Sequence, residues 1–72
     1  MMLSREEAIK ATASTMEVIK TDMYYICRAD GDSARFTTEF IENQKRRYEQ
    51  AGIIFDIKEF VAGILYNRLL NE

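Results

Sequence analysis

Apolar side chains recur at alternating spacings of three and four residues through the first third of the chain. One threonine shares their stripe, which consists of Ile9, Thr12, Met16, Ile19, Met23 and Ile26. Such spacing places side chains along one face of an α-helix. Ser4 and Glu7 precede the stripe in the arrangement of a capping box, which begins a helix. The pattern therefore predicts a first helix that starts after Ser4 and includes the whole stripe.

Glycines divide the rest of the chain. Gly31 lies in a polar stretch and predicts a turn after the first helix. A second helix is expected beyond it, and Gly52 offers the left-handed conformation that commonly follows the end of a helix. This helix has two candidate starts. A polar residue at the turn caps it in one interpretation, and Thr37 or Thr38 caps it at a later position in the other.

The third helix has the clearest start. Asp56 and Glu59 form a second capping box, and Phe55 and Phe60 occupy the two positions of a hydrophobic staple. The two isoleucines before Phe55 make this connection strongly apolar. We expect the three apolar side chains to close one end of a helical bundle. A short edge strand is the alternative, because isoleucine and phenylalanine favour strands.

The fold class follows from these elements. The chain has no proline and long stretches of good helix formers, which indicate an all-α protein. We expect a single domain over residues 1–72, with helices at about residues 5–28, 33–51 and 56–70. Connections of about four residues favour antiparallel neighbours, so the predicted architecture is a compact three-helix bundle in up-down-up order.

The expected helices carry more apolar surface than such a bundle covers. The first helix overhangs the third, and the third has apolar side chains outside its core-facing arc. Gly63 costs about 1 kcal/mol relative to alanine, which close approach of another helix explains. We therefore expect a homodimer through Met16, Met23, Gly63, Tyr66 and Leu70. The alternative is that the methionines fill the core, Gly63 is merely tolerated and the last two side chains fray at the chain end.

Composition removes most catalytic chemistry. The 72 residues include no histidine and one cysteine, Cys27, so we expect no histidine-dependent triad, no histidine-based zinc site and no intrachain disulfide. The expectation is a non-enzymatic protein with no catalytic residue, cofactor or metal. A lone thiol suits a reducing, cytoplasmic compartment. No apolar run or signal-peptide pattern indicates a membrane span or export.

One basic run stands out from a balanced charge of 12 acidic and 10 basic residues. Lys45, Arg46 and Arg47, together with Arg35, form a candidate phosphate-contacting patch for a small nucleic-acid-binding regulator. The opposing interpretation is a solvated lattice, because three consecutive helical residues fan over about 200° and acidic residues lie four positions away. We expect a protein–protein interaction role, as an adaptor, inhibitor or accessory factor, with nucleic-acid binding as the alternative.

Overall fold

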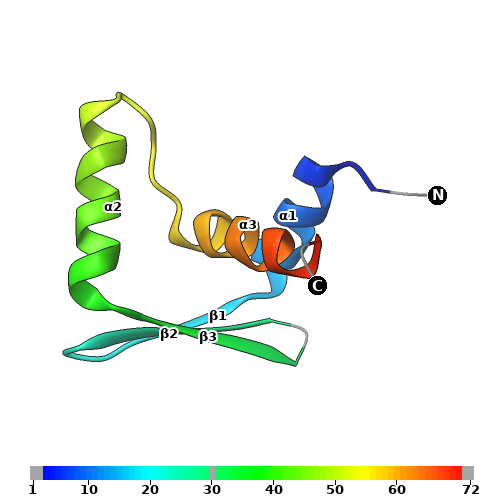
Figure 1. The fold of residues 1–72 in the computed structure, drawn as a ribbon, viewed down its shortest axis with the longest axis horizontal. Helices are drawn as coiled ribbons and strands as arrows, with labels where there is room; N and C mark the ends of the chain where they lie inside the picture. The colour runs from blue at the N-terminus through cyan, green and yellow to red at the C-terminus, as the bar shows by residue number, and fades with distance from the viewer. Residues whose placement is uncertain (1–2, 30, 71–72) are drawn as a thin grey trace.

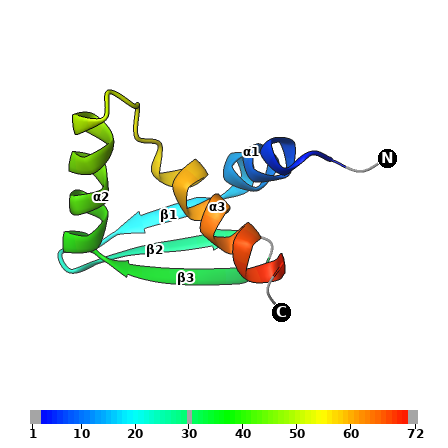
Figure 2. The same cartoon turned by 45° about the horizontal axis from the view of Figure 1, so that its top comes forward.

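The computed structural model describes residues 3–29 and 31–70 of the chain. The elements in chain order are α1 (Arg5–Thr15), β1 (Glu17–Lys20), β2 (Tyr24–Ala29), β3 (Asp32–Thr37), α2 (Thr38–Gln50) and α3 (Ile57–Leu70). The strands form an antiparallel sheet in the order β1-β2-β3. Helices α1 and α3 lie together over one face of the sheet, and α2 rises from one end of it (Figures 1 and 2). The expected all-α, three-helix bundle is therefore wrong, because the described residues combine a three-stranded sheet with three helices.

Residues 17–29 form a β-hairpin rather than the second half of a long helix. Strands β1 and β2 pair antiparallel, with Val18 opposite Cys27. The stretch is rich in β-branched and aromatic side chains, which favour strands. The expected helix over residues 5–28 is wrong beyond Thr15. The spacing of the apolar residues fits a helix, but in this stretch their side chains occupy strand positions that alternate between the two faces of a sheet.

Strands β2 and β3 are joined by a second tight turn. Ala29 pairs with Asp32 across it. Gly31 has a φ of 82°, a left-handed conformation that glycine adopts without strain. The sequence correctly predicted a turn at this glycine, but the chain continues as a strand and not as a helix.

Helix α2 starts later than the first interpretation placed it. The Thr37 hydroxyl accepts a hydrogen bond from the Phe40 N–H at 3.1 Å and caps the helix. The expected helix over residues 33–51 is therefore wrong in its first part, and the later start is confirmed. The first turn of α2 is also fixed to the β1–β2 turn, because the Thr38 N–H donates to the Met23 carbonyl at 2.8 Å.

The capping box at Ser4 is confirmed, and at Asp56 the structure shows the cap by the aspartate but, among the described residues, no return bond from the Glu59 carboxylate. The Ser4 hydroxyl accepts from the Glu7 N–H at 3.2 Å, and the capping box is complete. The Asp56 carboxylate accepts from the Lys58 N–H at 3.0 Å and from the Glu59 N–H at 3.3 Å. These caps satisfy backbone donors that have no partner inside their helices. Local hydrogen-bonding chemistry thus fixes where α1 and α3 begin.

The core lies between the α1–α3 pair and the inner face of the sheet. Most of the buried side chains in this core are small. The buried residues are Ala13, Met16, Cys27, Ala29, Val61, Ala62 and Leu65. Helix α2 is attached separately, because its buried residue, Ile41, lies outside this cluster. The molecule therefore consists of a packed body and one helix fixed to its edge.

Burial controls the chemistry of Cys27. The side chain is fully buried, and desolvation raises the pKa of its thiol above the ordinary value. Since the thiolate is the reactive form, we expect labelling by an aromatic disulfide reagent at pH 8 to be at least about tenfold slower in the native protein than after denaturation. Absorbance of the released thiolate measures both rates, and equal rates would contradict this burial.

Candidate protein-interaction surface

Five aromatic rings join α2 to the rest of the molecule. They belong to Phe36, Phe40, Tyr48, Phe55 and Phe60, and we call them the aromatic cluster. Adjacent ring centroids are between 5.0 and 6.3 Å apart, with stacked, tilted and edge-on pairs. Four of the five side chains are half-buried and Phe40 is exposed. The cluster thus holds α2 in place while leaving aromatic surface in contact with water.

The chain between α2 and α3, residues 51–56, is the connecting segment. Its two isoleucines do not close one end of the fold as expected, since Ile54 is 93% exposed and Ile53 is 56% exposed, whereas Phe55 packs against Tyr48 and Phe60. The Ile53 N–H donates to the Tyr48 carbonyl at 2.9 Å. Beyond it, the N–H groups of Ile54 and Phe55 donate to no residue in the described part of the chain. The segment combines uncovered apolar side chains with unused backbone donors.

The molecule exposes more surface than a compact chain of its size. Its accessible surface is 5544 Å², whereas a compact monomer of 8.4 kDa is expected to expose about 4,600 Å². Its radius of gyration is 12.6 Å, against about 11 Å expected for 72 residues. Both comparisons agree with the separate position of α2 seen in Figure 1.

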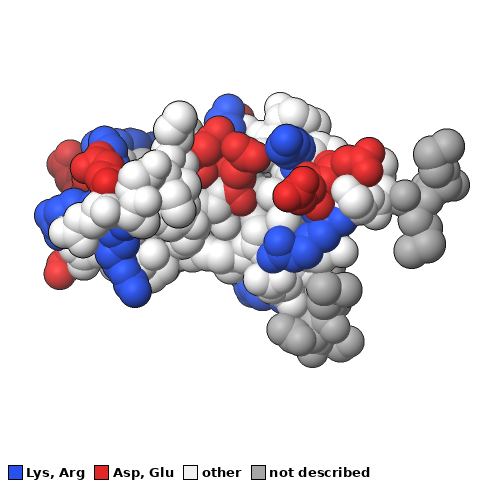
Figure 3. Space-filling model, turned by 90° about the horizontal axis from the view of Figure 1, so that it is seen from above, with Lys and Arg blue, Asp and Glu red and all other residues white. Residues whose placement is uncertain are grey.

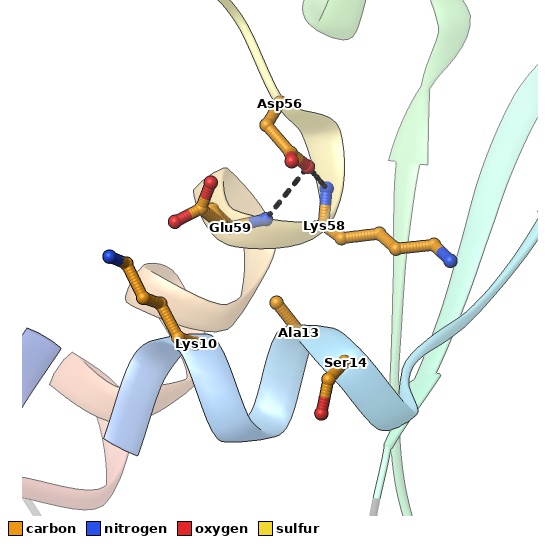
Figure 4. Close-up of a pocket in the computed structure, with 6 residues that line it drawn as sticks. All are labelled: Lys10, Ala13, Ser14, Asp56, Lys58 and Glu59. Atoms are coloured by element: carbon orange, nitrogen blue, oxygen red, sulfur yellow. Dashed lines mark hydrogen bonds between the residues drawn. The ribbon is translucent and has the colours of Figure 1, made fainter. Parts of the chain in front are cut away.

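The described surface also has shallow polar hollows. The one in Figure 4 lies between α1 and the start of α3, and it is lined by Lys10, Ala13, Ser14, Asp56, Lys58 and Glu59. The Asp56 carboxylate there caps α3, and the Lys58 side chain points away from α1. Its charges have both signs and one carboxylate is already used structurally. The hollow is therefore a shallow surface of mixed charge next to the cap of α3.

A smaller hollow adjoins the aromatic cluster. It is lined by Tyr48, Ile54, Asp56, Glu59 and Phe60. Two carboxylates thus border an aromatic and aliphatic surface. This combination of an apolar centre and a charged rim is typical of a protein-binding site.

The structure does not bring the five expected interface residues together. Met16 is buried in the core, and Gly63 faces α1. Tyr66 is half-buried, with the Arg5 guanidinium 5.7 Å from its ring centroid. Met23 is 68% exposed at the β1–β2 turn. The Leu70 side chain lies outside the described structure. The side chain beside Gly63 is Ile9 of the same chain, and this contact does not require glycine, because an added Cβ atom would lie 3.9 Å from it.

The candidate nucleic-acid residues are also separated. Arg35 lies on β3 between two residues that pack against the core, so its side chain is on the opposite, uncovered face of the sheet. Its guanidinium is 4.8 Å from the Tyr24 ring centroid. Lys45, Arg46 and Arg47 are exposed on α2, where Figure 3 shows basic and acidic side chains intermixed. The three residues thus lie on an exposed helix face of mixed charge, where the Arg46 guanidinium donates to the Asn43 side chain.

Comparisons with protein-family models, with curated proteins and with solved structures found no match to this chain. Among the described residues, no group of three or more potential metal ligands is close enough to hold an ion. None of the described helices has the length and apolar character needed to cross a bilayer.

The exposed surface of the connecting segment was not predicted from the sequence. Its two isoleucines were expected to close one end of a bundle, although an apolar run in a connection between helices is itself a signal of an exposed patch. The rings of the cluster come from β3, α2, α3 and the connecting segment. Their grouping depends on the tertiary fold, so no local pattern predicts it.

The surroundings of Gly63 predict a stabilising substitution. A Cβ atom at this position would lie 3.9 Å from the Ile9 Cδ1 atom, an ordinary van der Waals contact. Alanine also has the higher helix propensity, so Gly63→Ala should raise the free energy of unfolding by up to about 1 kcal/mol. Urea denaturation measures the change. A loss of stability would mean that α1 and α3 are packed more tightly than described.

Proposed function

We propose that this protein acts by protein–protein interaction and that it self-associates through the connecting segment and the aromatic cluster. The observation that carries the proposal is the exposure of Ile53 and Ile54 beside a half-exposed aromatic cluster. Contiguous apolar patches of this kind mark interaction sites, and aromatic residues are enriched at the centres of interfaces. A role as an adaptor, inhibitor or accessory factor is consistent with such a surface, and the lone thiol supports a reducing, cytoplasmic setting.

The size of the uncovered surface supports a partner of ordinary dimensions. The accessible surface exceeds that of a compact monomer by about 900 Å². A standard protein–protein interface covers about 800 Å² on each partner. The excess of the whole chain is thus similar in size to one side of a standard interface.

Self-association is tested by light scattering after size-exclusion chromatography. We expect a dimer at about 50 µM, and an Ile53→Ser/Ile54→Ser variant should weaken association about 150-fold or more, because two buried isoleucines contribute roughly 3 kcal/mol or more to an interface. A Leu3→Ser/Met23→Ser variant is the matched control, since Leu3 is 58% exposed and Met23 is similarly exposed away from the segment. A monomer at this concentration refutes self-association.

Nucleic-acid binding is the second candidate, and the contact between Arg35 and Tyr24 favours it. An arginine stacked on an aromatic ring, on a sheet face that no described helix covers, provides a platform for an unpaired base. Arg28 lies on the same face but forms an ion pair with Glu17. The net charge of −2 opposes this candidate, because phosphate contacts dominate affinity.

This candidate predicts salt-dependent binding of a single-stranded oligonucleotide. Tyr24→Ala should weaken binding about tenfold through lost stacking, and Arg35→Ala should also reduce it. Arg46→Ala/Arg47→Ala is the control, because it removes charge at a distance from the sheet face. Fluorescence anisotropy at low salt measures binding, and no binding to DNA or RNA removes the candidate.

A further inference from the structure

Helix α2 takes no part in the buried core of the body, which consists of α1, the sheet and α3. Its one buried residue, Ile41, lies outside the cluster of buried side chains that those elements share. Figures 1 and 2 show the helix rising from one end of the sheet, beside the α1–α3 pair. A free helix of 13 residues is marginal in water, so α2 stays helical through its contacts with the body.

Two kinds of contact hold α2 against the body. At its first turn, the Thr38 N–H donates to the Met23 carbonyl at 2.8 Å. Further along the helix, Phe40 and Tyr48 contribute its rings to the aromatic cluster. Both rings are partly open to water, and Phe40 is 39% exposed. Because hydrophobic stabilisation grows with the area that is buried, these rings hold α2 less firmly than fully buried side chains hold the body.

The chain on either side of α2 is anchored independently of it. Thr37 pairs with Tyr24 in the sheet, and Ile57 packs against the core at the start of α3. Residues 38–56 can therefore unfold into a loop whose two ends remain fixed to the body. Such a loop breaks no contact within the cluster of buried side chains, and its residues regain conformational entropy.

From this arrangement we infer that residues 38–56 open and close as one unit while α1, the sheet and α3 stay folded, and that the opening takes the aromatic cluster apart. Phe36 and Phe60 remain on the body in the open form, whereas Phe40 and Tyr48 leave with α2. Proteins commonly open through cooperative units of this kind, at a lower free energy than global unfolding. The inference concerns the single chain and does not depend on self-association.

The opening acts as a switch on the candidate surface. The Tyr48 and Phe60 rings, whose centroids are 6.0 Å apart, line the hollow beside Ile54 and separate when α2 opens. A partner that needs the intact surface binds the closed form alone, so its apparent affinity falls with the closed fraction. A change on α2 that shifts the opening equilibrium therefore alters binding without touching the contacts of the partner.

Native-state hydrogen exchange followed by NMR tests the opening, in low urea and at a concentration where light scattering gives a monomer. Amides of residues 42–50 are hydrogen-bonded within α2. Their protection factors should be at least about tenfold lower than those of the most protected amides of β2 and α3. Their protection should also fall less steeply with urea, because the opening exposes less surface than global unfolding. Equal protection with equal urea dependence in α2 and the body overturns the inference.

Two substitutions separate local opening from global unfolding. Gly63→Ala stabilises α3, so it should raise the protection of the most protected body amides up to about fivefold. It should leave the α2 amides unchanged, because the body is folded in both the closed and the open form. Phe40→Ala weakens the aromatic cluster and should lower the protection of the α2 amides about tenfold. If Gly63→Ala raises protection equally in α2 and the body, α2 opens only with the whole molecule and the inference is wrong.

The basic run of α2 provides an independent probe. Proteolysis of a folded protein follows the population of its open form when opening and closing are fast. Trypsin should therefore cut after Lys45, Arg46 or Arg47 before it cuts after Arg28 or Arg35, which are exposed arginines held in the sheet. Phe40→Ala should accelerate the cut in α2 about tenfold, and mass spectrometry identifies the products. A first cut in the strands, or equal rates at the two places, overturns the inference.

Discussion

The packing of α1 against α3, over one face of the sheet, is the constraint on which the rest of the structure depends. The buried contact is made largely by alanines, a cysteine and a valine, and Ile9 lies beside Gly63 with room for one more carbon atom. Small side chains bring backbones together but bury little area each, so the stabilisation from this core is limited. The chain consequently places its larger side chains, the phenylalanines and Tyr48, in a separate and incompletely covered cluster.

That division explains the contrast between the two parts of the molecule. The body has a continuous core, whereas α2 depends on Ile41, on the aromatic cluster and on backbone hydrogen bonds at its first turn. An isolated helix of 13 residues is marginal in water, so these attachments are needed to keep it folded. A partner chain that covered the aromatic cluster would therefore also stabilise the folded position of α2.

Sequence reasoning succeeded where the governing interactions are local. The caps at Ser4 and Asp56, the turn at Gly31 and the contact of Phe55 with Phe60 all depend on residues within a few positions of one another. It failed where periodicity was ambiguous. The stripe through Met16 and Ile26 fits a helix, although Val18, Tyr24 and Tyr25 favour strands, and the pairing of Cys27 with Val18 and Ala34 depends on long-range contacts. The candidate surface was missed for the same reason, since its rings meet through tertiary packing.

Strand β3 ends at Thr37, and α2 begins at the next residue. With no loop between them, the helix behaves as a stiff rod set directly on the edge of the sheet. A rod of 13 residues is about 20 Å long, so a rotation of about 10° at its base displaces its far end by about 3.5 Å. The contacts of Tyr48 with Phe55 and Phe60, near that far end, oppose such a rotation, so the direction of the helix is fixed at both of its ends.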